Sequence, residues 1–226
     1  MLKFIKNCML FSITVIGVSC YSQTTESDQM LKNSVTITSF DYGDKGLVGS
    51  SYINDAFLPA KLSDNNETYF LRYNAYKDEM EGKKNNNFYR LIKKLDYTIS
   101  FKAIDKTYKV LNYEDDNKNI LGFFVVLFNG DKISLLAKER IKFFEEVKAK
   151  TGYDKYQPPT LKQLKDKLYI SYNNKEASEL PDRKNDILNL FSSKAVEVEK
   201  YAKKNKLKLK STDDLIQLFK YYNALN

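Results

Sequence analysis

The stretch from Ile120 to Ala137 constrains the fold more than any other part of the chain. Its first half is an unbroken apolar run from Leu121 to Phe128, as found in a central strand that is covered on both faces. The pair Asn129-Gly130 follows and is favoured in two-residue hairpin turns, because both positions of such a turn need a positive φ. Apolar residues then return at every second position. We therefore predict a β-hairpin here, within an antiparallel sheet.

Further strands are indicated by apolar residues that recur at every second position elsewhere in the chain. They are expected within residues 35–38, 69–75, 97–103 and 167–172. Residues 139–150 are compatible with either a helix or a continuation of the preceding strand. Polar stretches such as residues 115–117 separate the runs and are typical of turns.

Beyond Pro181 the apolar spacing changes from two residues to that of an amphipathic helix. Residues 211–214 combine hydroxyls with two carboxylates, as is favoured at a helix N-terminus. The stripe that follows is expected to be buried and consists of Leu215, Leu218, Phe219 and Tyr222. The connector 203–210 is too polar for much burial, apart from Leu207 and Leu209.

These patterns predict an α+β fold. Its antiparallel β-sheet is a meander, which could be strongly curved or barrel-like, and a small C-terminal helical tail follows it. We expect a signal peptide at residues 1–22, a flexible lead at 23–33, an antiparallel β domain at 34–180 and a helical segment at 181–226 that packs on the sheet.

The first residues have the parts of a bacterial secretory signal. Lys3 and Lys6 give a positive start, and an apolar run from Met9 to Val18 follows them. This run is too short to span a bilayer, which takes about 20 residues. We therefore expect an exported protein, in the periplasm or associated with the outer membrane.

Two processing sites are compatible with this signal. Cleavage after Ser22 would leave Gln23 as the first residue, and this is the site we favour. Alternatively, Val18-Ser19-Cys20 resembles a lipobox whose cysteine is lipidated, although Gly17 stands where such boxes usually carry a branched apolar residue. Contact with a membrane is expected only through lipidation of Cys20.

The residue types that are missing exclude several kinds of chemistry. The chain has no histidine, and its two cysteines, Cys8 and Cys20, both lie in the signal region. Serine–histidine and cysteine–histidine catalysis, the usual zinc sites and disulfides of the mature chain are therefore excluded. The formal charge of +8 is spread among interspersed acidic residues rather than gathered into a basic stripe. We expect no cofactor, no metal site and no nucleic-acid partner.

Two ligand-binding motifs are matched only in part. Asp115, Asn117 and Asn119 have the first spacings of an EF-hand loop, but its glycine and its bidentate glutamate are missing. Residues 46–51 contain two glycines and two serines, but no lysine follows as in a phosphate-binding loop. Both segments are therefore interpreted as turns.

Asp78, Glu79 and Glu81 form the densest acidic group beside aromatic residues. On a strand, Glu79 and Glu81 would share one face at a separation of about 7 Å. Carboxylate pairs of glycosidases have comparable separations. An ordinary exposed strand face has the same spacing, so an enzyme that uses only carboxylates is our third hypothesis.

The chain has 17 tyrosines, many of them in the predicted sheet. Tyrosine side chains can form a recognition surface, but they also fill strand faces in ordinary cores. If they form such a surface, the candidate binding residues are Tyr69, Tyr73, Tyr76 and Tyr97.

Three segments together carry a family resemblance. They run from Phe70 to Glu81, from Leu121 to Ala137 and from Asp213 to Leu225. In these segments the chain resembles a family of uncharacterised exported proteins of Bacteroidetes, over nearly all of the mature sequence. The resemblance implies a location in the cell envelope and no particular activity.

The leading functional hypothesis is a non-enzymatic cell-envelope protein that binds or assembles with an unknown envelope protein through its sheet or its helical tail. The alternative is a periplasmic carrier of an apolar ligand, a lipid or a lipoprotein, enclosed by a strongly curved sheet with helices at one side. The two hypotheses differ in whether the inward-facing side chains leave a cavity.

Overall fold

The computed structural model describes residues 34–37, 46–63, 67–85, 87–149, 155–172, 174 and 176–225, with residues 34–37 described by their backbone. The predicted signal peptide, the lead at 23–33 and the processing residues Cys20, Ser22 and Gln23 lie outside these ranges. None of the helices in the described ranges is long and apolar enough to cross a membrane.

Eleven strands in the described ranges form one continuous sheet. They are β1 (Ser34–Ile37), β2 (Leu58–Leu62), β3 (Thr68–Asn74), β4 (Glu79–Lys84), β5 (Asn87–Leu91), β6 (Thr98–Phe101), β7 (Lys106–Asp115), β8 (Lys118–Phe128), β9 (Ile133–Phe144), β10 (Thr160–Tyr172) and β11 (Glu176–Glu179). Their order is β1-β5-β4-β3-β2-β6-β7-β11-β10-β9-β8.

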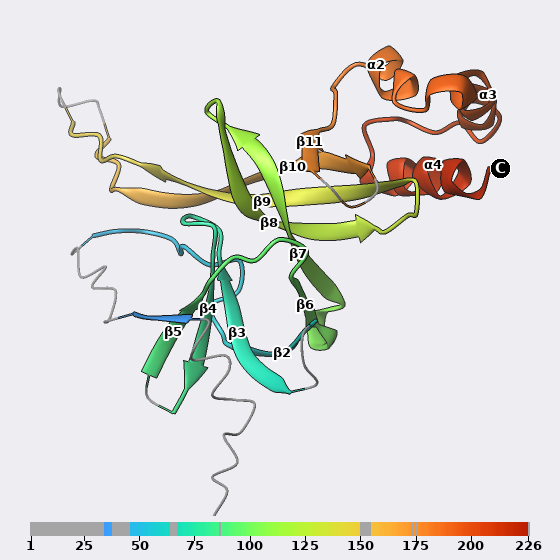
Figure 1. Ribbon diagram of the computed structural model, residues 1–226. Helices are drawn as coiled ribbons and strands as arrows, with labels where there is room; N and C mark the ends of the chain where they lie inside the picture. The colour runs from blue at the N-terminus through green and yellow to red at the C-terminus, as the bar shows by residue number, and fades with distance from the viewer. Residues whose placement is uncertain are drawn as a thin grey trace, which may run out of the picture.

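The last five strands close into a barrel-like ring. β7 pairs with β8 as well as with β11, so the ribbon of strands β7 to β11 returns to its own beginning (Figure 1). The pairing of β11 with β7 is parallel, whereas the other strand pairs are antiparallel. The predicted α+β class, with a curved antiparallel sheet and a helical tail, is confirmed.

The predicted hairpin at Ile120 to Ala137 is confirmed as β8 and β9, but the predicted two-residue turn is wrong. The strands are joined by residues 129–132, and Gly130 does not have a positive φ. The side chain of Asn223 holds this loop from the helical tail, since its amide group bonds both the N–H and the C=O of Ile133. A Cβ on Gly130 would lie 2.3 Å from the Asn223 oxygen, so this glycine permits close approach rather than a turn.

Elsewhere, strands lie at or near the positions that the alternation of apolar residues predicted. The ambiguous segment after Glu139 continues as a strand to Phe144. The turn predicted at residues 115–117 joins β7 to β8, and Asp116 and Asn117 adopt φ values of 47° and 59° there. The turn with two positive φ values, which was predicted at Asn129-Gly130, is therefore found instead in the preceding hairpin, between β7 and β8.

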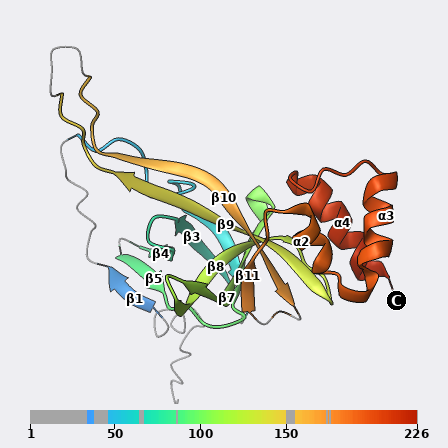
Figure 2. The ribbon, with the colours of Figure 1, turned by 90° about the horizontal axis from the view of Figure 1, so that it is seen from above.

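The helical tail lies against one end of the ring (Figure 2). It contains α2 (Lys184–Asn189), α3 (Ala195–Lys204) and α4 (Thr212–Ala224), and short 3-10 helices occur at η1 (Lys102–Ile104) and η2 (Ser192–Lys194). The predicted stripe of α4 is confirmed, because Leu215, Leu218 and Phe219 are buried and Tyr222 is partly buried. In the connector, Leu209 is buried and Leu207 is partly buried, as predicted.

Apolar side chains form three clusters around the ring. One lies between the ring and the N-terminal strands, one fills the ring itself, and one lies between the ring and the helices. Strand β8 contributes to two of them, because Phe123 points out of the ring and Phe124 points into it. This explains its unbroken apolar run, and it confirms that the strand is covered on both faces.

Candidate functional site

A largely buried carboxylate, Asp78, whose side chain is 18% exposed, joins the N-terminal strands to the ring. Asp78 lies in the turn between β3 and β4 with a φ of 55°. It accepts hydrogen bonds from the ammonium groups of Lys138 and Lys93, each at 2.7 Å, and from the Tyr73 hydroxyl at 2.7 Å. The backbone N–H of Phe123 is a fourth donor, at 3.2 Å. Such full hydrogen bonding is what a carboxylate needs in order to remain charged when buried.

Lys138 extends into the ring from β9. Its ammonium group lies 4.9 Å from the centre of the Tyr113 ring and 4.8 Å from that of Phe124, and it donates to the C=O of Phe123 at 3.1 Å. A Cβ on Gly122 would lie only 2.7 Å from the Lys138 nitrogen. The glycine inside the apolar run of β8 therefore makes room for a buried charge.

In this ion pair, burial and the opposite charge shift each pKa in opposite directions. Burial raises the pKa of Asp78, but the ammonium groups of Lys138 and Lys93 outweigh it and hold that pKa below 3.8. Burial lowers the pKa of Lys138, and Asp78 opposes that shift. We treat the pair as charged because four donors converge on the carboxylate.

The ion pair occupies a point where two strands separate. β8 and β9 are paired at Val125 and Ala137, and the same register would place Phe123 opposite Glu139. Phe123 pairs with no β9 residue, and its N–H and C=O bond Asp78 and Lys138 instead. The two charged side chains thus form the hydrogen bonds with the backbone of β8 that β9 does not form at this point.

The predicted acidic group is divided among different partners. Glu81 accepts two hydrogen bonds from Arg72, at 3.0 and 2.8 Å, while Glu79 accepts one from Arg90 at 2.6 Å. Asp78 points to the ring, as described above. Each of these three carboxylates is therefore neutralised by its own cations, an arrangement in which loss of one partner destabilises the fold.

A second buried carboxylate, Glu139, lies at the same junction. It accepts hydrogen bonds from Tyr108 at 2.5 Å and from Lys106 at 2.7 Å. The Tyr73 and Tyr108 rings lie 4.9 Å apart, so the two buried networks adjoin. Burial, with the neighbouring carboxylates, raises the pKa of both tyrosines well above 10.

The candidate binding tyrosines differ in their exposure. Tyr69 and Tyr73 are buried in the cluster between the ring and the N-terminal strands, and Tyr97 packs partly buried against it. Tyr76 is exposed. Core packing thus accounts for the positions of Tyr69 and Tyr73, and a common binding surface of the four tyrosines stays a prediction.

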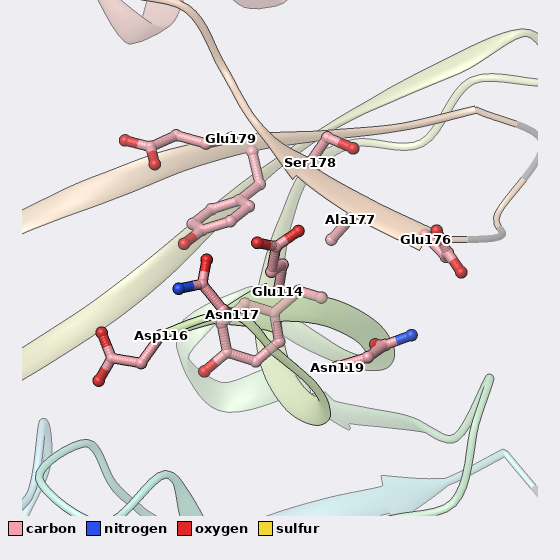
Figure 3. A pocket seen from close by; sticks show the side chains of 10 residues that line it. Glu114, Asp116, Asn117, Asn119, Glu176, Ala177, Ser178 and Glu179 are labelled. Atoms are coloured by element: carbon pink, nitrogen blue, oxygen red, sulfur yellow. The ribbon is translucent and has the colours of Figure 1, made fainter.

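A polar hollow of about 730 Å³ opens at the mouth of the ring (Figure 3). Side chains of the β7–β8 turn and of β11 line it from two sides, among them Glu114, Asp116, Asn119, Glu176 and Glu179. Within the ranges that the structure describes, no group of three or more acidic residues is arranged to hold a metal ion.

A two-stranded arm, which we define as residues 140–149 and 155–164, carries several exposed apolar side chains. It consists of the outer halves of β9 and β10, of the segment that follows β9 and of the segment that precedes β10, and these two segments meet at the Val147–Gln157 bridge. In both views these strands run side by side away from the helical tail (Figures 1 and 2). Four large apolar side chains of the arm are 39–56% exposed, namely Phe143, Phe144, Val147 and Tyr156.

The arm also carries lysines without counter-ions. Lys142 of β9 lies directly opposite Lys162 of β10, so the two side chains share one face of the arm. Neither has a carboxylate partner in the described part of the chain. Like charges in this position destabilise a strand pair, so the fold itself gains nothing from them.

Sequence reasoning did not identify the arm or Lys138. The segment after Glu139 had a composition typical of a helix, which hid its strand period. A glycine inside an apolar strand was a usable signal, because it indicates a close approach by another group.

No protein-family model, curated protein or solved structure matches the chain. The resemblance to exported proteins of Bacteroidetes therefore stays a prediction.

Proposed function

We propose that the protein is a non-enzymatic binding protein of the cell envelope, and that its arm is the surface that binds a partner protein. The observation that carries this proposal is the combination of four exposed apolar side chains with unpaired lysines on a ribbon that projects from the sheet. Exposed apolar groups rimmed by polar side chains are typical of surfaces that another protein covers.

The charged groups elsewhere support this choice. Glu81 and Glu139 are buried and Asp78 is largely buried, and each of the three has a cationic partner within 2.8 Å. Their contacts account for them as structural groups that join β-strands. The arm combines unpaired lysines with four exposed apolar side chains, three of which are aromatic.

The alternative of an apolar carrier has less support. In the described part of the chain, the inside of the ring is filled by side chains of all five ring strands, and the six most buried are Leu111, Tyr113, Phe124, Leu136, Tyr169 and Ala177. The hollow at its mouth is lined mainly by polar groups. A carboxylate enzyme has no observation in its favour, because the candidate carboxylates are paired. Export, with the protein in the periplasm or at the outer membrane, remains part of the proposal and rests on the sequence.

The proposal is tested by site-specific photo-crosslinking in cells that make the protein naturally. A photoreactive phenylalanine analogue at Phe144 should form an adduct with one partner protein. The same analogue at Phe70 is the matched control, because Phe70 is an exposed phenylalanine on a strand away from the arm. Equal adducts from both positions, or none from Phe144, would contradict the proposal.

A further inference from the structure

The outer half of β9 has a free edge. β8 is paired with β9 from Phe128 to Val125, and the last β9 residue in this register is Ala137. From Lys138 to Phe144, the paired strand on β9 is β10 alone. On its other side, β10 is covered at Thr160 by a parallel bridge to Val48. Within the described ranges, β9 is therefore the open edge of the arm.

The backbone of Phe143 points toward this open edge. The N–H of Leu161 donates to the C=O of Val48 at 2.8 Å, so it points away from β9. Phe143 is the residue opposite Leu161. In an antiparallel pair, two opposite residues point their N–H and C=O groups both toward each other or both away. Phe143 therefore presents its N–H and C=O to the free side.

Ile141 presents the same groups to the same side, because the direction of the backbone alternates along a strand. These positions also have the parity of Ala137, which β8 covers. β9 thus continues past β8 with its hydrogen-bonding groups in the orientation that accepts a strand. No hydrogen bond from another described residue reaches the N–H or C=O of Ile141 or Phe143 on this side.

The side chains beside this edge select the chemistry of a partner. Arg140, Lys142 and Phe144 lie on one face of β9, with Lys162 of β10 beside them. Arg140 donates to the C=O of Lys165 at 2.8 Å, while its buried Nε has no acceptor among the described residues. The opposite face is apolar: Ile141 is buried in the cluster between the ring and the N-terminal strands, and Phe143 is exposed. A strand added to this edge would meet cations on one face and apolar groups on the other.

We propose that the free edge of β9 at residues 140–144 accepts an extended segment of a partner protein as an additional β-strand, and that this segment alternates acidic with apolar residues. This inference rests on the proposed function, because it specifies how the arm binds. Backbone hydrogen bonds would supply affinity, and the alternating side chains would supply selectivity.

Charge and backbone polarity argue against other occupants. A second copy of the chain that paired edge to edge would bring Lys142 and Arg140 against the same residues, and like charges oppose such a contact. A lipid surface would leave the N–H and C=O groups of Ile141 and Phe143 unsatisfied, which is costly in hydrocarbon.

The test uses synthetic peptides and the full mature protein. The probe is a short fluorescent peptide in which glutamate alternates with valine, and binding is followed by fluorescence anisotropy. Three matched peptides serve as controls: one has lysine for glutamate, one has the same composition in non-alternating order, and one carries N-methyl groups on alternate amides. The alternating acidic peptide should bind at least tenfold more tightly than each control.

The decisive variant is Phe143→Pro, with Phe143→Leu as its control. Proline removes only the outward N–H at this position and is tolerated at strand edges, so the thermal midpoint should change little. Peptide affinity should fall at least tenfold in Phe143→Pro and less than threefold in Phe143→Leu. Independently, the pair Lys142→Glu and Lys162→Glu should reverse the preference, so that the lysine peptide binds better than the glutamate peptide. Unchanged affinity in Phe143→Pro, or no reversal in the double variant, would overturn the inference.

Failure of strand addition can be separated from failure of the proposed function. If Phe144 still crosslinks one partner in the Phe143→Pro background, the arm binds a partner through side chains only, and the strand inference alone is wrong. If Phe144 crosslinks no partner while the peptide binds as expected, the proposed function is wrong. A dimer that Phe143→Pro abolishes, or charge-dependent binding to anionic vesicles with no peptide binding, would overturn the choice of occupant.

Discussion

The two halves of strand β9 differ in the environment of their charged side chains. In the inner half, Lys138 and Glu139 are buried, and each ionic group has a partner of opposite charge at 2.7 Å. In the outer half, Lys142 is exposed and lies opposite another lysine. One continuous strand therefore changes from a structural element to an open edge within a few residues.

The change occurs where β8 leaves β9. At that point Asp78 accepts a hydrogen bond from the N–H of Phe123, and Lys138 donates one to its C=O. β8 can therefore separate from β9 without leaving the backbone groups of Phe123 unsatisfied. The buried ion pair thus completes the ring and at the same time leaves the outer edge of β9 uncovered. Changes to the buried ionic groups of the inner half should damage stability, whereas changes to the exposed side chains of the outer half should damage only binding.

The largest expected effect is that of Lys138→Ala. It leaves the buried Asp78 with Lys93 as its remaining ionic partner, and breaking a buried pair typically costs about 3–5 kcal/mol of unfolding free energy. Lys142→Ala, four positions along the same strand, is the control and should change stability by no more than about 0.5 kcal/mol. Urea denaturation of both variants measures the difference. Equal midpoints would remove the distinction between the two halves.

A smaller loss is expected from Gly122→Ala. The added Cβ would lie 2.6 Å from a ring atom of Tyr113 and 2.7 Å from the Lys138 nitrogen, so both must move. Overpacking of this kind costs about 1–3 kcal/mol. In a double-mutant cycle with Lys138→Ala, part of the Gly122→Ala penalty should disappear. Strictly additive effects would show that the glycine is not there to accommodate the lysine.

Acid should weaken the inner half selectively. The folded pKa of Asp78 is held below its unfolded value, so its contribution to stability is present above that unfolded value and is lost as the pH falls through the folded pKa. Between about pH 5 and about pH 2, the wild type should therefore lose more unfolding free energy than Asp78→Asn does. Denaturation at several pH values measures both slopes, and parallel slopes would argue against a charged Asp78.

Alkali should act on the same region through its tyrosines. Because burial raises the folded pKa of Tyr108, its contribution is present below the unfolded pKa near 10 and is lost as the pH rises further. Tyr108→Phe should therefore flatten the fall in stability above about pH 10. Tyrosinate absorbance of Tyr108 in the wild type should appear only with unfolding, and its appearance in the folded protein would contradict the buried contact with Glu139.

The sequence predicted what depends on local periodicity. Half-buried strands, the doubly covered β8 and the stripe of α4 each repeat within a few residues, so their patterns were readable. Contacts between distant segments were not readable. Asp78 meets Lys138 across 60 positions, and the turn at Asn129-Gly130 is set by Asn223 in α4 rather than by its own residues.

The candidate site was missed for a related reason. A strand edge is free when no neighbouring strand pairs with it. The residues around Phe143 do not indicate that the pairing of β8 with β9 ends at Val125. The ring also depends on a short parallel contact of β11 with β7, which involves only Glu176 and Ala177 of β11. Such a contact leaves no periodic signal.

Residue-resolved amide hydrogen exchange of the arm, with and without the alternating glutamate–valine peptide, measures directly whether the edge of β9 is open. Without the peptide, the outward amides of Ile141 and Phe143 should exchange rapidly, while those of Lys142 and Phe144, which face β10, should be protected. The peptide should then slow exchange at Ile141 and Phe143 and leave Lys142 and Phe144 almost unchanged. If Ile141 and Phe143 are already protected in the free protein, or if the peptide leaves them unprotected, the edge of β9 is not an open binding site.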